Sequence, residues 1–149
     1  MWRKWIWLAM SGAVFGSILG CGAGSNKVTG TAKIKGGGPL TSGRVMLYPD
    51  GPDGSGKNAT GGIGKDGTFT LGMVKVDDGA LPGRYTVVIT GAMEPETRTY
   101  EQATQGIGQA PKPLIHTKYT AATTSDLKIE VKPGANKFDF ELDPYERAK

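Results

Sequence analysis

The side chains that carry most enzyme chemistry are scarce in this chain, which has one cysteine, Cys21, and one histidine, His116, in 149 residues. A nucleophilic triad needs a serine and a carboxylate placed around the histidine, and the sequence holds no G-x-S-x-G motif. A closed zinc or iron–sulfur site needs several ligands, which one cysteine and one histidine do not supply. The sequence therefore predicts no enzyme activity, no metal site and no cofactor.

Four aspartates raise the alternative of a calcium site: Asp50, Asp53, Asp77 and Asp78. Calcium takes six to eight oxygen ligands from a shaped loop, and the EF-hand spacing ends on a glutamate. The segment "DGPDGSGKN" has neither that spacing nor that glutamate, and its composition is typical of turns. We therefore interpret these aspartates as turn residues.

The first twenty residues have the layout of a secretory signal. Arg3 and Lys4 form a basic start, the run 5–19 carries no charge, and small residues precede Cys21. A membrane-spanning helix needs about 20 apolar residues, whereas this uncharged run is shorter and contains serine and glycine. We expect residues 1–20 to be a signal peptide, with an uncleaved anchor helix as the alternative.

Cys21 has four interpretations, which are an intermolecular disulfide, a metal ligand, a buried thiol and a lipid attachment site. The segment Ile18-Leu19-Gly20-Cys21 resembles the bacterial lipobox, in which a small residue precedes the lipidated cysteine. The resemblance implies diacylglyceryl on Cys21, cleavage after Gly20, and membrane anchoring through two or more acyl chains, which bind stably. It also implies secretion, and Gly22 in place of an aspartate favours the outer membrane or the periplasmic face.

Removal of residues 1–20 changes the charge of the chain. Arg3 and Lys4 are lost and no acidic residue is, so the net charge falls from +4 to +2. All three tryptophans are lost as well. No run of lysine and arginine is longer than two residues, so the charge pattern of a nucleic-acid-binding protein is missing.

The remaining chain predicts an all-β domain over 27–143, because short runs of alternating apolar and polar residues are separated by glycine-rich turns. We expect seven strands, at 27–35, 43–49, 59–63, 68–72, 83–90, 127–132 and 137–142. Asp66-Gly67 predicts a two-residue hairpin turn, and the last two strands are expected to form an antiparallel hairpin. We expect residues 21–26 to be a lipidated N-terminus and flexible tether, residues 91–126 to be a long loop, and residues 144–149 to be a frayed tail.

The domain resembles transthyretin-like or carboxypeptidase-regulatory-like domains of bacterial surface lipoproteins. The likeness rests on "VTGTAKIKGGGPLTSGRVMLYP", "GKDGTFTL", "DGALPGRYTVVIT" and "PLIHTKYTAATTSDLKIEVKPGANKFDFEL" in this order. It implies a seven-stranded antiparallel β-sandwich of prealbumin-like (immunoglobulin-like) topology without enzymatic activity. The catalytic relatives use several histidines, an arginine and a C-terminal Tyr-Arg-Gly-Ser, and this chain departs from that pattern.

Four residues of the long loop are candidates for contact with a ligand or a partner: Tyr100, His116, Lys118 and Tyr119. Tyr119 has two interpretations. Its ring either stacks on a sugar or a partner protein, or packs against the sandwich while its hydroxyl bonds to the backbone, as buried tyrosines do; packing is favoured.

The resulting hypothesis is a non-catalytic, lipid-anchored module of the cell envelope with a structural or protein-interaction role. Its partners are the membrane, through the acyl chains on Cys21, and envelope proteins or glycans, but no nucleic acid. A carbohydrate-binding module is the first alternative and a transthyretin-related hydrolase the second, since a fold alone does not settle function.

Overall fold

Seven strands make up almost all of the regular structure in the computed structural model, which describes residues 26–51 and 57–146. Each strand begins and ends within one residue of the range predicted from the sequence. The strands are β1 (Val28–Ile34), β2 (Arg44–Pro49), β3 (Ala59–Gly62), β4 (Thr68–Leu71), β5 (Gly83–Thr90), β6 (Lys128–Val131) and β7 (Asn136–Leu142). Two single-turn helices, α1 (Tyr100–Thr104) and η1 (Thr117–Thr120), lie in the segment predicted as a loop.

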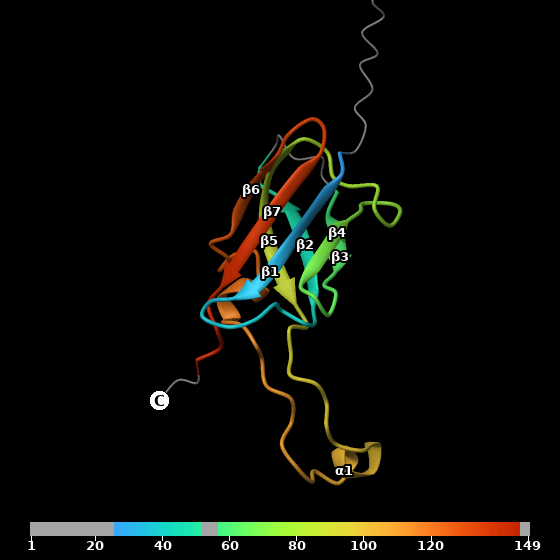
Figure 1. Cartoon of the computed structure of the whole chain (residues 1–149), viewed down its shortest axis with the longest axis vertical. Coiled ribbons are helices and arrows are strands. Elements are labelled where there is room, and N and C mark those ends of the chain that lie inside the picture. The colour runs from blue at the N-terminus through green and yellow to red at the C-terminus, as the bar shows by residue number, and fades with distance from the viewer. Residues whose placement is uncertain (1–25, 52–56, 147–149) are drawn as a thin grey trace, which may run out of the picture.

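The strands form two sheets, one ordered β4-β1-β7 and the other β3-β2-β5-β6 (Figure 1). The expected all-β class with two sheets is confirmed, but the sheets are not antiparallel throughout. The first strand pairs in parallel with the last, from Val28 opposite Asn136 to Ile34 opposite Leu142. The order also differs from the constant-type immunoglobulin order, in which the first two strands share a sheet, because β1 and β2 lie in different sheets.

The expected hairpin of the last two strands is wrong. β6 pairs with β5 in the four-stranded sheet, whereas β7 pairs with β1 in the three-stranded sheet. The turn between them therefore crosses from one sheet to the other. Asn136 stabilises this turn, because its side chain accepts a hydrogen bond from the Lys132 amide and donates to the Lys132 carbonyl.

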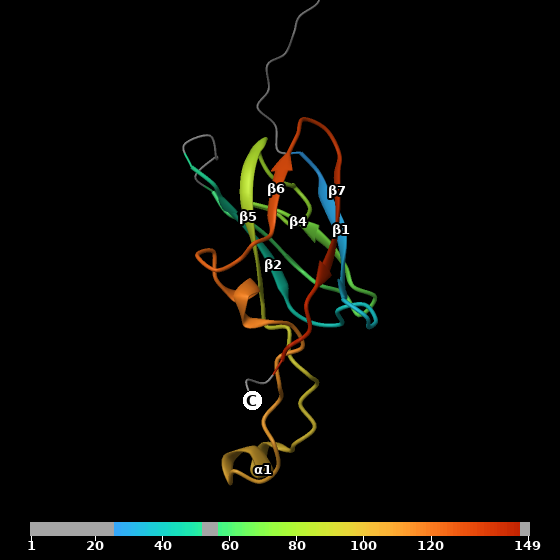
Figure 2. The same ribbon diagram turned by 90° about the vertical axis from the view of Figure 1, so that its left-hand side faces the viewer.

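One hydrophobic core is shared by the two sheets, which lie as two layers in Figure 2. Alternate residues of each strand point into it, as the period of two requires. The fully buried side chains include Val28, Val45, Leu47, Leu71, Tyr85, Val87, Ile89, Val131 and Leu142. Val88, on the opposite face of β5, is also only 2% exposed, so both faces of that strand are buried at this point.

Two turns fix local geometry next to the core. The Tyr85 hydroxyl donates a 2.9 Å hydrogen bond to the Leu81 carbonyl, four residues upstream, in the manner of a tyrosine corner. At Asp66-Gly67 the predicted turn forms, but its type differs, because only Gly67 has a positive φ and a type I′ turn needs two such residues. Asp66 instead accepts hydrogen bonds from the amide and the hydroxyl of Thr68.

Gly30 lies in the middle strand of the three-stranded sheet, between Phe69 of β4 and Phe138 of β7. A Cβ at this position would lie 1.9 Å from the Phe138 carbonyl oxygen and 2.5 Å from the Phe69 ring. The missing side chain leaves room for the Phe69 ring, which stacks on Phe140 with centroids 5.6 Å apart. Gly30 thus lets the two flanking strands pack across β1.

We expect Gly30→Ala to lower the free energy of unfolding by about 2 kcal/mol or more, because the added methyl group overpacks the core against backbone. Gly62→Ala is the matched control, since a Cβ there meets nothing within 4 Å. Urea titrations of both variants measure the difference. Equal stability of the two variants would contradict the packing described for Gly30.

Candidate functional site

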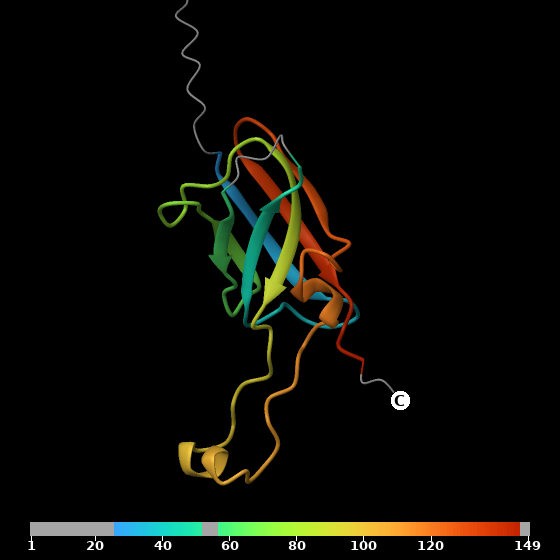
Figure 3. The ribbon, with the colours of Figure 1, turned by 180° about the vertical axis from the view of Figure 1, so that it is seen from behind.

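The most prominent feature outside the sheets is a protrusion formed by residues 91–115, which we call the arm (Figures 1 and 3). It leaves the end of β5 and returns to the body just before η1. Its two legs pair near the body, where Glu94 donates a backbone hydrogen bond to Lys112 and Leu114 donates one to Ala92. The arm therefore continues the body as two paired legs, within the segment 91–126 that the sequence predicts to be a long loop.

The tip of the arm is held by local hydrogen bonds around α1. Thr99 caps this helix in a capping box with Gln102, each side chain bonding to the backbone of the other residue. Just before the cap, Arg98 makes a two-pronged ion pair with Glu96, at 3.0 Å and 2.9 Å. The hydrogen bonds from the Arg98 side chain lower the pKa of Glu96 to about 2. The tip keeps its shape through these bonds without packing on the core.

Apolar side chains on the arm are exposed. Tyr100 is 83% exposed and Ile107 is 52% exposed, both at the tip, and Met93 is 39% exposed near the base. Tyrosine, methionine and arginine are enriched at protein interfaces, and loops held by a rigid scaffold often carry binding residues. The arm therefore exposes side chains of types that are common at protein interfaces.

The base of the arm is built on η1. His116 caps this helix, and its Nδ1 accepts a 3.1 Å hydrogen bond from the Lys118 amide. Tyr119 belongs to the core with 3% of its surface exposed, while its hydroxyl reaches the end of β7. That hydroxyl donates to the Asp143 carboxylate at 3.0 Å and accepts from the Asp143 amide at 3.2 Å.

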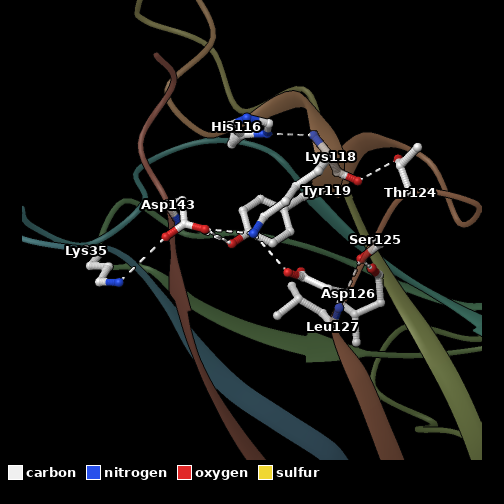
Figure 4. Close-up of polar contacts among 10 residues, drawn as sticks. Lys35, His116, Lys118, Tyr119, Thr124, Ser125, Asp126, Leu127 and Asp143 are labelled. Carbon is white, nitrogen blue, oxygen red and sulfur yellow. Dashed lines mark hydrogen bonds and ion pairs between the residues drawn. The ribbon is translucent and has the colours of Figure 1, made fainter.

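Asp143 is the centre of a small polar cluster at this base (Figure 4). Lys118 Nζ lies 2.7 Å from the Asp143 carboxylate and 2.8 Å from the Asp126 carboxylate. Lys35 approaches Asp143 from the other side at 3.9 Å. The pKa of Asp143 is lowered mainly by the hydrogen bond from Lys118 and, to a smaller extent, by the one from Tyr119. The pKa of Lys118 is raised mainly by its hydrogen bond to Asp126 and, to a smaller extent, by the one to Asp143.

The segment after β7 completes this base. Pro144 forms a bridge with Ile115, and the Tyr145 amide donates to the Leu114 carbonyl. These residues were assigned to a frayed tail from the sequence, so that boundary is wrong for Pro144 and Tyr145. The returning leg of the arm is thus fastened to the C-terminal strand.

The structure brings together three of the four candidate contact residues. His116, Lys118 and Tyr119 share η1 and its cap, whereas Tyr100 lies on α1 at the tip of the arm (Figure 1). The burial of the Tyr119 ring agrees with the favoured interpretation, in which this ring packs against the sandwich. Cys21, the predicted lipid attachment site, lies outside the described residues.

Sequence reasoning missed the carboxylates of Asp126 and Asp143, which reach Lys118 across 8 and 25 positions of the chain. No local pattern marks either pair. It also missed α1, although Thr99-Tyr100-Glu101-Gln102 has the S/T-x-x-E/Q pattern of a capping box.

A pocket of about 500 Å³ lies beside the cluster, lined by Lys35, His116, Lys118, Asp143, Pro144 and Glu146. Ligand pockets are lined mostly by apolar side chains, whereas the lining here is charged, and Lys118 and Asp143 neutralise each other. In the described ranges no three His, Cys, Asp or Glu side chains gather as metal ligands. We therefore interpret the cluster as a structural fastening of the arm.

No helix within residues 26–51 and 57–146 is long and apolar enough to span a membrane.

Comparison with known proteins gives little further information. No family model matches the chain, and no curated protein does. Among solved structures, the chain is similar to a DUF3823 family protein from Parabacteroides merdae ATCC 43184, with 16% identity and a TM-score of 0.45. The match covers 83% of this chain and 48% of the other, so the chain spans about half the length of that protein.

The lowered pKa of Asp143 predicts that the stability of the fold depends on pH. A carboxylate with a lowered pKa stabilises the folded state fully above its unfolded pKa of about 3.9, and this contribution is lost as the pH falls toward the lower folded pKa. We expect Asp143→Asn to be less stable than wild type at pH 7, and to lose less stability than wild type between pH 5 and pH 2. Urea titrations across this range measure both.

Asp77→Asn is the control for loss of one carboxylate, because Asp77 lies in the loop after β4, away from Lys118. It separates the loss of one negative charge from the loss of the hydrogen bonds of the cluster. An Asp143→Asn profile parallel to wild type would show that the cluster does not link folding to protonation.

Proposed function

We propose that this chain is a lipid-anchored, non-catalytic module of the cell envelope that presents the arm to a partner protein. The observation that carries the proposal is the placement of the start of β1 and the arm at opposite ends of the sheets (Figures 1 and 2). A chain anchored ahead of Asn26 would hold the arm on the side facing away from the membrane.

The anchoring part rests on the sequence Ile18-Leu19-Gly20-Cys21, which resembles a lipobox, and on the signal-like residues before it. Asn26 is fixed to the body, because it exchanges backbone hydrogen bonds with Ala80 at 2.7 Å and 2.9 Å. An acylated Cys21 would therefore hold this end of the domain close to the membrane, on the periplasmic face or at the outer membrane.

The interaction part rests on the arm. Its tip exposes Tyr100 and Ile107 on a frame fixed by the capping box and by the ion pair of Arg98. A preorganised loop loses less conformational entropy on binding than a loose one. This arrangement supports a protein partner with a complementary apolar pocket.

For the fold we propose a prealbumin-like β-sandwich. Two observations support it over the immunoglobulin order. The first two strands lie in different sheets, and the first and last strands pair in parallel. The shared core and the tyrosine corner at Tyr85 are consistent with a sandwich of this general kind.

Glycan binding remains the alternative to a protein partner, and Tyr100 is the observation that favours it. Its ring is exposed and could stack on a sugar, whereas the ring of Tyr119 is buried. A transthyretin-related hydrolase has less support, since Nδ1 of His116 is occupied by the Lys118 amide.

The anchoring is tested by metabolic labelling with palmitate, followed by intact-mass measurement of the membrane fraction. We expect the label in wild type and in Tyr100→Ala, with the mature chain beginning at an acylated Cys21, and no label in Cys21→Ser. Incorporation that survives in Cys21→Ser would refute the assignment of the lipid to this thiol.

Partner binding is tested with a photo-crosslinking residue at position 100 in intact membranes. We expect a discrete protein adduct from this position and none from position 137, an exposed site on β7. Crosslinks that are equal at both positions, or that carry glycan alone, would contradict a protein partner for the arm.

A further inference from the structure

A second exposed apolar feature lies in the loop between β4 and β5, which projects from the side of the body in the half away from the arm (Figures 1 and 3). Val74 is 75% exposed and Val76 is 89% exposed, the largest fraction among the exposed large hydrophobic side chains of the described residues. These valines belong neither to the hydrophobic core nor to the arm. We propose that residues 73–77, the valine loop, insert into the lipid surface as a second membrane contact, an inference that rests on the proposed anchoring of Cys21.

The first argument is distance along the chain. Five residue steps separate Cys21 from Asn26, and a fully extended chain spans at most about 3.3–3.6 Å per residue. An acylated Cys21 would thus hold Asn26 within about 18 Å of the lipid headgroups. The end of the body at which Asn26 lies must then face the membrane at short range.

The second argument is the position of the valine loop relative to Asn26. Asn26 pairs with Ala80, three residues after the end of the loop. Gly79 packs closely against Asn26, because a Cβ on Gly79 would lie 1.9 Å from the Asn26 carbonyl oxygen. Figure 1 shows the loop between β4 and β5 projecting sideways from the body, near the end of the sheet at which β1 starts.

The third argument is the rigidity of the loop. The Asp78 carboxylate accepts hydrogen bonds from three successive amides, those of Met73, Val74 and Lys75, at 2.5, 3.1 and 3.0 Å. The Gly79 amide also donates to the Leu71 carbonyl and closes the base. The valines are therefore presented on a fixed frame, and insertion would not have to order the loop first.

The charges of the valine loop favour a lipid surface over a strongly charged partner. Lys75 lies between the two valines, and a lysine can keep its ammonium group at headgroup level while its stem lies in apolar surroundings. Asp77 is exposed at the base of the loop, so the positive charge of Lys75 is offset locally. We expect apolar burial to dominate the contact, with little dependence on anionic lipid.

The test uses the full lipidated chain reconstituted into phosphatidylcholine vesicles, with and without phosphatidylglycerol. Because the only native cysteine would carry the lipid, Val76→Cys provides a single thiol for an NBD fluorophore. Ile107→Cys, exposed at the tip of the arm, is the matched control. We expect the label at position 76 to shift to the blue and to be quenched several-fold more strongly by spin-labelled lipid than the label at position 107.

Adding Val74→Ser to the Val76→Cys chain should reduce both signals, whereas adding Ile107→Ser should leave them unchanged. Chains that float with the vesicles but give the same water-like emission at positions 76 and 107 would overturn the inference and leave the anchoring intact. A blue shift that grows with protein density and resists lipid-borne quenching would indicate a second copy and also overturn it. Chains that are not acylated and do not float would refute both proposals.

Discussion

The parallel pairing of β1 with β7 is the constraint on which the rest of the structure depends. Parallel strands run in the same direction, so the start of β1 and the end of β7 must lie at opposite ends of the sheet. Asn26 is therefore placed at one end, next to the valine loop, and Asp143 at the other end. Gly30 makes the pairing compatible with a packed core, because it leaves space for the phenylalanine ring of β4 against β7.

Asp143 connects the end of β7 to the base of the arm. It directly follows β7, and its carboxylate binds Lys118 and the hydroxyl of the buried Tyr119. The returning leg of the arm is thereby held to the last strand, while the outgoing leg continues from β5. The pairing of β1 with β7 thus orients the arm away from Asn26. The opposite placement of the proposed anchor and the proposed partner surface follows from this one topological feature.

The sequence predicted the strands well and their partners poorly. Alternation identifies a half-buried strand such as 137–142 within one residue, because the period of two is a local property. It does not say which strands are neighbours, so β6 and β7 looked like a hairpin although the turn at Asn136 crosses between sheets. Lys118 was a candidate from its sequence neighbourhood, but its partner Asp143 is 25 positions away and left no local signal. The arm was predicted as a loop because α1 buries no residue and so has no apolar period.

The central claim is that the two ends of the domain differ in their distance from the membrane. Energy transfer from a donor to acceptors in the bilayer surface measures this height directly on the lipidated chain. With the donor at position 100 on the arm, we expect much weaker transfer than with the donor at position 132, in the turn between β6 and β7 at the end near Asn26. Equal transfer from both positions, or stronger transfer from the arm, would contradict the account.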